Sequence, residues 1–219
     1  VNILGQDVRS CFIIPKFIYL FKTWLVKYNI RMEYIKVDKV LTFQGEDAVS
    51  FLDSLISNEF VEGKIVPSFL LFPDGKINYW FLTEQNDEVV NIYQKNEELV
   101  KIKETFEKYK IRIKCEIEIK DIDVHLKINS DTFESGFDDN YKGNDLLTWD
   151  EITLNTELPT LETIENGLLP NETKWLLTFL NFEKGCFLGQ EPVSRVNFRG
   201  RPRRKLITNE AGAQEFIKI

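Results

Sequence analysis

A hairpin signal in the first half of the chain constrains the fold more than any other feature. Apolar runs at residues 66–72 and 77–82 are separated by Pro73-Asp74-Gly75-Lys76. An Asp-Gly pair between two apolar runs is typical of a tight β-turn, because that turn needs a positive φ, which glycine adopts without steric cost. A hairpin joins antiparallel strands, so any sheet in this protein is at least partly antiparallel.

Further helices and strands are predicted on both sides of this hairpin. The predicted strands are 33–44, 111–119, 121–129 and 146–154, and the predicted helices follow residue 47 and cover 96–109 and 161–167. The acidic segment 130–145 is predicted to be a loop. Since the strands are partly antiparallel and mixed with helices, the sequence predicts an α+β fold.

The helix after Gly45-Glu46-Asp47 illustrates the pattern. Its two acids are expected in the first turn, where they complement the helix dipole. Its apolar positions follow the spacing of a core-facing stripe; they are Ala48, Phe51, Leu52, Leu55 and Ile56.

The segment before residue 32 is apolar but interrupted by Pro15, Lys16, Lys22 and Lys27. No uninterrupted apolar run approaches the ~20 residues that span a bilayer, and no small-residue cleavage site follows. A helix packed on the body, a membrane-surface anchor and an extension from an upstream start remain open, and membrane association is not expected. The expected domains are an extension (1–31), one domain (32–205) and a tail (206–219).

The charge is distributed unevenly. The chain has 28 basic and 35 acidic residues, a net charge of −7. Six of the basic residues lie in the acid-free segment 195–205, which leaves 22 against 35, or −13, elsewhere. An acidic protein is not expected to bind nucleic acid in general, whereas a basic patch on it suits a small anionic ligand or a local acidic partner.

The cysteines and the histidine exclude several kinds of site. Cys11, Cys115 and Cys186 are odd in number and form no CxxC pair, so no disulfide framework is expected and a cytoplasmic location is the simplest. Cys115 lies on an apolar strand face and is predicted to be buried and inert. The single His125 cannot form a histidine-based metal site, and we expect no metal.

The most unusual stretch of the sequence is Lys184-Gly185-Cys186-Phe187-Leu188-Gly189-Gln190-Glu191. Its glycines permit sharp turns and the close approach of a ligand. The cationic neighbours Lys184 and Arg195 favour a thiolate, so Cys186 is predicted to be the most reactive thiol. Alternatively, the glycines only shape a turn in which a small residue fits, and the residues alone leave both interpretations open.

This stretch matches the K-G-C-[FY]-x-G-Q-E signature of YgfZ-type proteins, which resemble the glycine-cleavage aminomethyltransferase (T protein). Arg195 and Phe198-Arg199-Gly200 follow it as in that family. Three upstream segments are also similar to the family: 45–58 with Gly45, Asp47, Ala48 and Asn58, the hairpin turn 71–77, and Ile164–Glu172. The similarity spans about residues 35–205, and between 85 and 155 it is one of pattern only.

The resemblance implies an aminomethyltransferase-like fold of two α+β subdomains with mostly antiparallel sheets around an opening that holds a folate. A pterin ring needs a flat slot and a carboxylate for its N–H groups, and the resemblance implies Glu165 and Glu172 as candidates. The anionic glutamate tail needs basic residues, and the candidates are Lys184, Arg195 and Arg199. The implied cofactor is tetrahydrofolate or a one-carbon derivative, and the functional thiol maps to Cys186.

Two departures from the family pattern bear on the expected function. A T protein carries acidic residues just after the hairpin turn, whereas Asn78 and Tyr79 stand here, which argues against aminomethyl transfer. The family also ends in a β-barrel of many tens of residues, whereas 14 residues follow Lys205. We therefore expect the C-terminal barrel to be absent or vestigial.

The expected function is that of a tetrahydrofolate-binding accessory factor in iron–sulfur cluster assembly or repair. It would act through residues 184–191, with iron–sulfur client or assembly proteins as partners. Because one cysteine cannot hold a four-ligand cluster, Cys186 would give one ligand to a shared cluster or react with a folate-borne one-carbon unit. The alternatives are a folate-dependent one-carbon transferase with an unknown acceptor and, third, a nucleic-acid module built on residues 199–205.

Overall fold

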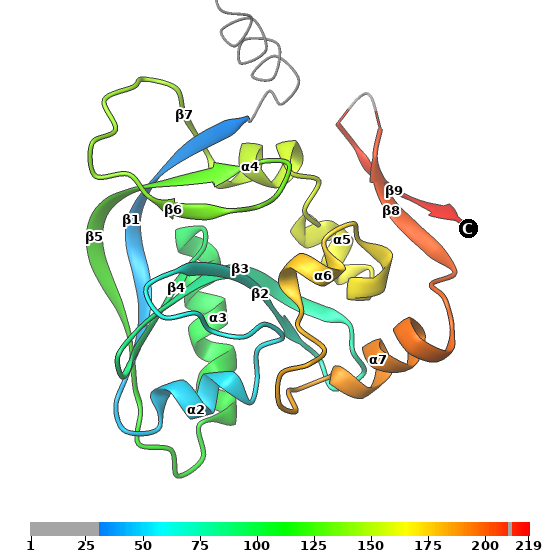
Figure 1. The fold of residues 1–219 in the computed structure, drawn as a ribbon, viewed down its shortest axis with the longest axis horizontal. Helices are drawn as coiled ribbons and strands as arrows, with labels where there is room; N and C mark the ends of the chain where they lie inside the picture. Colours follow the sequence, from blue (N-terminus) through cyan, green and yellow to red (C-terminus); the bar gives the residue numbers. More distant parts are fainter. Residues whose placement is uncertain (1–30, 210–211) are drawn as a thin grey trace, which may run out of the picture. The chain divides into compact units, whose positions relative to one another are not determined.

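In the computed structural model, which describes residues 31–209 and 212–219, six strands pair in a closed antiparallel ring (Figure 1). They are β1 (Met32–Gln44), β2 (Ile65–Leu71), β3 (Ile77–Asn86), β4 (Val89–Tyr93), β5 (Glu116–Asn129) and β6 (Ser135–Phe137). Their order is β4-β3-β2-β6-β5-β1, and the additional pairing of β1 with β4 closes the ring. The short strand β7 (Leu146–Leu147) adds to β1 in parallel. The mostly antiparallel α+β expectation is therefore confirmed.

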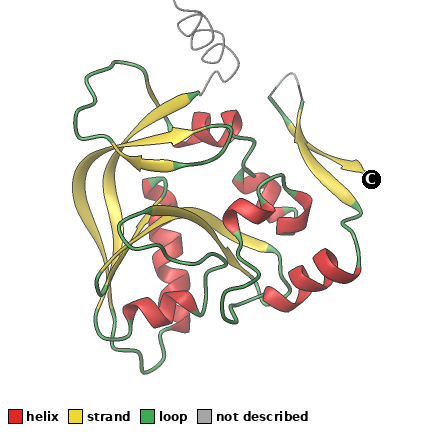
Figure 2. Cartoon of the chain, in the orientation of Figure 1, coloured by secondary structure: helices red, strands yellow, loops and turns green. Residues whose placement is uncertain are grey.

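The helices lie on two sides of the strands (Figures 1 and 2). One group contacts β1, β4 and β5 and consists of α2 (Ala48–Asp53) and α3 (Asn96–Tyr109). The other follows β7 in the chain and consists of α4 (Trp149–Asn155), α5 (Leu161–Glu165), the 3-10 turn η1 (Pro170–Glu172), α6 (Leu176–Phe179) and α7 (Gln190–Arg199). Within it, α5 contacts β3 and α6 contacts β2.

Strands β2 and β3 are buried on both faces because each faces a different hydrophobic core. Successive side chains of a strand point to opposite sides. Leu70 and Phe81 accordingly belong to the core shared with α2 and α3, whereas Phe69, Leu71 and Trp80 belong to the core shared with α4–α6. The strands that form the hairpin therefore hold both helix groups in place.

The hairpin itself is confirmed. Strands β2 and β3 pair antiparallel, and Gly75 has φ +84° in the turn between them. The helix predicted for 96–109 is α3, with Leu99, Ile102 and Phe106 fully buried. The helix predicted around 161–167 is α5.

Two predicted strand boundaries are wrong. The segments 111–119 and 121–129 were expected as two strands, but one strand, β5, runs from Glu116 to Asn129 because it pairs with β1 along its whole length. The first residues of the predicted strand are not part of β5. Ile111 is 73% exposed, and Arg112 has a positive φ, which an extended strand does not adopt. Cys115 is nevertheless buried, and burial raises the pKa of its thiol.

Segment 130–154 also differs from the prediction. The expected loop contains the short strand β6, and only residues 146–147 of the expected strand 146–154 are extended. Helix α4 begins immediately afterwards because Thr148 and Glu151 form a capping box, in which each side chain accepts a hydrogen bond from the other residue's backbone N–H.

The acids before α2 do not lie in its first turn as predicted. The side chain of Asp47 accepts a hydrogen bond from the Lys114 N–H, and Glu46 forms an ion pair with the Lys114 ammonium. They therefore fasten the loop before β5 to the start of α2. The predicted apolar stripe of this helix is buried throughout, although the helix ends at Asp53 and Leu55 and Ile56 follow it.

The C-terminal residues form a hairpin of β8 (Arg204–Thr208) and β9 (Gln214–Lys218), which spans the expected domain boundary between 205 and 206. Residues 32–219 form one structural unit. The expectations for residues 1–30, including Cys11, lie outside the described residues. In the part of the chain that the structure describes, no helix combines the length and apolarity needed to cross a membrane.

Candidate functional site

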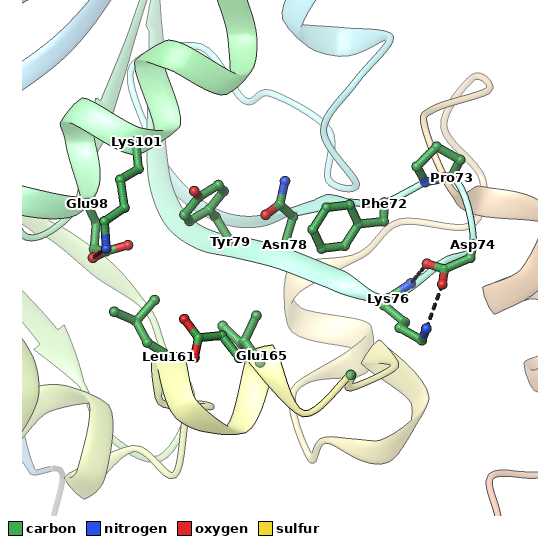
Figure 3. Close-up of a pocket in the computed structure, with 12 residues that line it drawn as sticks. Phe72, Pro73, Asp74, Lys76, Asn78, Tyr79, Glu98, Lys101, Leu161 and Glu165 are labelled. Atoms are coloured by element: carbon green, nitrogen blue, oxygen red, sulfur yellow. Dashed lines mark hydrogen bonds and ion pairs between the residues drawn. The ribbon is translucent and has the colours of Figure 1, made fainter. Parts of the chain in front are cut away.

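A cleft of about 630 Å³ lies between the turn of the β2–β3 hairpin, helix α3 and helix α5 (Figure 3). Side chains from the three elements face it from different directions. They are Phe72, Pro73, Asp74, Lys76, Asn78 and Tyr79 from the hairpin, Glu98 and Lys101 from α3, and Leu161, Ile164 and Glu165 from α5. Three segments that are distant in the sequence thus build one cleft.

A β-bulge turns two consecutive residues of β3 toward this cleft. Leu70 pairs with Tyr79 and Leu71 with Ile77, so Asn78 is an extra residue on the β3 side. A bulge of this kind re-aims a side chain that regular alternation would send to the opposite face. Asn78 and Tyr79 therefore both line the cleft, at the positions where the sequence comparison with T proteins expects carboxylates.

Glu98 supplies a carboxylate at this cleft from a different element. It lies in the first turn of α3, only 6% exposed, and its Oε1 accepts a hydrogen bond of 2.9 Å from the Lys101 ammonium. Its Oε2 is buried and has no hydrogen-bond partner among the described residues. A buried carboxylate oxygen without a donor carries a considerable free-energy cost, which an N–H group of a ligand that reached this atom would relieve.

The prediction from sequence missed Glu98. A signal was available, since Glu98 lies four residues before Ile102 and eight before Phe106, and so stands on the buried stripe of the helix.

A second cavity of about 330 Å³ adjoins the first and shares Tyr79, Glu98, Leu161 and Ile164 with it. Trp80 and Trp149 line it, with ring centroids 6.1 Å apart. The shared residues make the two cavities neighbours. Glu98 is the buried carboxylate that faces both.

Glu165 is the one predicted ligand-binding residue that lines the cleft. It is the last residue of α5 and is exposed, and no hydrogen bond or ion pair joins its carboxylate to another described residue. Figure 3 shows its side chain opposite Asn78 and Tyr79. Its carboxylate is therefore available to a ligand.

Glu172, the second predicted carboxylate, is engaged elsewhere. It is 6% exposed, and its Oε1 accepts a hydrogen bond of 2.8 Å from the Arg204 guanidinium. Its Oε2 accepts a hydrogen bond from the Leu169 N–H. Glu172 does not line the cleft but joins η1 to β8.

Lys184, a predicted ligand of the anionic tail, has its ammonium group surrounded by protein. Its side chain is 2% exposed, and the Nζ donates to the carbonyl oxygens of Asp53, Ile56 and Asn58 at 2.9–3.1 Å and lies 2.9 Å from the Asp53 carboxylate. Burial lowers the pKa of Lys184, and Asp53 opposes that effect. Because its N–H groups are already paired, Lys184 fastens the signature segment to the end of α2.

The remaining predicted residues are exposed and outside the cleft. Cys186 has an exposed free thiol on the loop before α7. Arg195 pairs with Glu191 at 2.6 Å on the surface of α7, and Arg199 is the last residue of that helix. The structure therefore brings Glu165 to the cleft but separates it from the predicted thiol and arginines.

The signature segment packs directly on the hairpin turn. Gly189 has φ +77°, and a Cβ at this position would collide with the Phe72 carbonyl oxygen and lie 2.9 Å from the Leu71 side chain. A Cβ on Gly75 would in turn lie 2.9 Å from Pro192. Both glycines are needed because the signature segment and the hairpin turn are in close contact here. The same contact therefore explains the glycine in each of the two motifs.

The charges of the cleft are nearly balanced, with three carboxylates (Asp74, Glu98, Glu165) and two lysines (Lys76, Lys101). A hydrogen bond from Lys76, whose ammonium lies 2.7 Å away, lowers the pKa of Asp74. Burial raises the pKa of Tyr79, so its phenol remains a neutral donor at physiological pH. The cleft therefore offers both carboxylate acceptors and ammonium or phenol donors to a polar ligand.

Comparison with known proteins supports the fold. No protein-family model matches the sequence, and no curated protein matches it. A solved structure that does match is the glycine cleavage system aminomethyltransferase T from Bartonella henselae, with a TM-score of 0.54 and 12% sequence identity. The match covers 80% of this chain and 65% of that one, so this chain spans about two thirds of the length of its structural neighbour. At this identity the comparison shows an aminomethyltransferase-like fold.

Proposed function

We propose that this protein binds a tetrahydrofolate-type ligand in the cleft between the hairpin turn, α3 and α5. The observation that carries the proposal is the buried, unpartnered Oε2 of Glu98 at the junction of two cavities. The similarity in fold to an aminomethyltransferase supports it. The arrangement of two subdomains around a folate opening belongs to the same proposal.

The cleft residues fit such a ligand. A pterin ring presents adjacent N–H donors, which a carboxylate accepts well, and Glu98 and Glu165 offer carboxylate oxygens from two sides. Tyr79, Trp80 and Trp149 provide aromatic walls in the adjoining cavity. The anionic tail would meet Lys76 and Lys101, whose side chains are about half exposed at the cleft, whereas the side chain of Lys184 is 2% exposed.

Titration calorimetry of the full chain with tetrahydrofolate tests this proposal. Hydrogen bonds to charged groups contribute about 1.5–3 kcal/mol, so Glu98→Gln should weaken binding by about tenfold or more. Glu165→Ala should weaken it as well. Glu97→Gln is the matched control, because Glu97 is exposed on the same helix and lines neither cavity. Equal affinity of Glu98→Gln and Glu97→Gln would reject the site.

The finer proposal is a role as an accessory factor in iron–sulfur cluster assembly or repair, with Cys186 as the thiol that meets a partner. The proposal is supported by the position of the Cys186 thiol, which is exposed on a loop fixed on both sides of it. Lys184 and Phe187 are buried on either side of it, and the Leu188 N–H donates to the Ser54 carbonyl, so an exposed thiol stands on an anchored loop.

Cluster reconstitution on an apo-ferredoxin tests the finer proposal. The wild-type chain should accelerate reconstitution, and Cys186→Ser should not. If both accelerate it equally, or neither does, the iron–sulfur role is rejected while the folate site is unaffected.

A second candidate function is folate-dependent one-carbon transfer to an unknown acceptor. It is favoured by Glu98, which places a carboxylate at the cleft although Asn78 and Tyr79 replace the acids expected after the turn. Turnover of methylene-tetrahydrofolate with ammonia or a small thiol as acceptor would establish it. Tight binding without turnover would favour the accessory role.

A further inference from the structure

Two hollows that the proposed folate site does not use adjoin helix α7. The side chain of Phe198, here called the ridge, lines both of them and is 68% exposed. The first hollow, of about 490 Å³, is also lined by Leu177, Leu180 and Phe182. The second, of about 430 Å³, is lined by Arg195, Arg199 and Ser194 among others. We call these two hollows and the ridge the α7 surface.

The apolar half of the α7 surface carries two large apolar side chains that are mostly exposed. Leu177 is 76% exposed beside Phe198. The Phe182 and Phe198 rings meet edge to face, with centroids 5.1 Å apart, which holds the Phe198 ring at the rim of the hollow. A rigid exposed aromatic ring next to an exposed leucine is typical of protein-binding surfaces, where aromatic residues and arginine contribute most of the affinity.

The charge beside it is positive and largely unpaired. Arg204 is turned inward to Glu172, and Arg195 pairs with Glu191. The other basic residues of this segment are exposed and form no ion pair with the described residues; they are Arg199, Arg201, Arg203 and Lys205. Among the lining residues, the acids are Glu183 in the apolar hollow and Glu191, the partner of Arg195, in the second hollow.

We propose that the α7 surface docks a segment of a partner protein that carries a large apolar side chain flanked by acidic residues. The apolar side chain would enter the hollow beside Phe198, and the acids would meet Arg199 and the basic residues that follow it. Charge complementarity selects this partner, because the patch is small and basic while the rest of the chain has a net charge of −13 by sequence. An extended nucleic acid would meet that acidic remainder beyond the patch.

Fluorescence anisotropy with the full chain tests the proposal. The probe is a labelled synthetic peptide in which a Leu-Leu pair is flanked on both sides by three glutamates. Phe198→Ala and Arg199→Glu should each weaken its binding by about tenfold or more, as expected for central interface residues. Ile111→Ala is the matched control, since Ile111 is 73% exposed on the loop before β5 and should leave binding unchanged.

Each other outcome overturns the proposal. Absence of peptide binding at millimolar concentration would reject a protein-docking role, as would equal binding of a peptide with Ser-Ser in place of Leu-Leu. Tighter binding of a 12-nucleotide oligouridine, with a steep salt dependence, would make this surface a nucleic-acid site. A dimer in sedimentation experiments that Phe198→Ala dissociates would identify a second copy of the chain as the occupant. None of these results depends on the folate cleft.

Discussion

Replacement of Lys184 by Met separates a structural role of this lysine from a ligand-binding role. Methionine keeps an unbranched apolar stem of similar length but removes the ammonium group. Three partly buried carbonyl oxygens, of Asp53, Ile56 and Asn58, then lose their donor, and the Asp53 carboxylate loses its ion-pair partner. The change should therefore destabilise the fold.

The expected size of the effect follows from those contacts. Removing one partner of a buried charged interaction costs about 3–5 kcal/mol, and the Asp53 carboxylate, 44% exposed, recovers part of that by hydration. We expect a loss of about 3 kcal/mol, which for a domain of this size lowers the Tm by about 6–12 °C. Lys114→Met is the control: Lys114 and its partner Glu46 are both 70% or more exposed, and its loss should change stability by less than about 0.5 kcal/mol.

Urea unfolding followed by circular dichroism measures both variants, and calorimetry with tetrahydrofolate below the Tm measures binding. Lys184→Met should be less stable yet bind with wild-type affinity. The reasoning is refuted if Lys184→Met has wild-type stability and has lost its affinity for tetrahydrofolate, because Lys184 would then be a ligand-binding residue.

The pH dependence of the same pair of proteins provides an independent check. Burial lowers the folded-state pKa of Lys184 below its ordinary value of 10.5. Between the lowered pKa of the folded state and the ordinary value of 10.5, the unfolded chain binds more protons than the folded one. The free energy of unfolding therefore rises with pH in this range. The difference in unfolding free energy between wild type and Lys184→Met should widen as the pH rises toward 10.5, and a constant difference would contradict the assigned burial.

Three further predictions concern other parts of the molecule. Gly189→Ala should destabilise the fold by more than about 1 kcal/mol, because alanine is strained at positive φ and its Cβ would press on the hairpin turn; an unchanged midpoint in urea would contradict this contact. Glu172→Gln should also lower the midpoint, since Arg204 loses a charged partner that is 8% exposed, without altering tetrahydrofolate affinity. In peptide mapping after brief iodoacetamide treatment of the native protein, the exposed Cys186 should be alkylated well before Cys115, whose thiol is buried and has a raised pKa; equal rates would show that Cys115 is accessible.

Local patterns in the sequence were sufficient for those parts of the fold whose structure depends on neighbouring residues. The Asp74-Gly75 turn requires a positive φ whatever surrounds it, and the hairpin is where the sequence places it. The apolar spacing of 96–109 likewise determines α3 to the residue. The boundary of β5 was missed, because its extent depends on pairing with β1, which no local alternation encodes.

The candidate site depended more on tertiary structure. By itself the sequence singled out Glu165, and the fold does place it at the cleft. It also singled out Lys184 for its charge and Glu172 for its place in a motif. In the structure the Lys184 ammonium pairs with Asp53, and the Glu172 carboxylate pairs with Arg204. The sequence of a motif is the same whether its charged residue binds a ligand or pairs with a neighbouring part of the protein. Only the folded structure distinguishes these two roles.

Glu98 shows the reverse case. Its sequence context is that of a charged helix, and only its position four residues before Ile102 and eight before Phe106 indicates burial. Only the folded arrangement, in which α3, the hairpin and α5 line one cleft, removes this carboxylate from water and leaves one oxygen without a donor. The sequence alone determined the β2–β3 hairpin, helix α3 and the α+β class of the fold. Tertiary structure decided which carboxylates line the cleft, because that depends on contacts between segments that are distant in the chain.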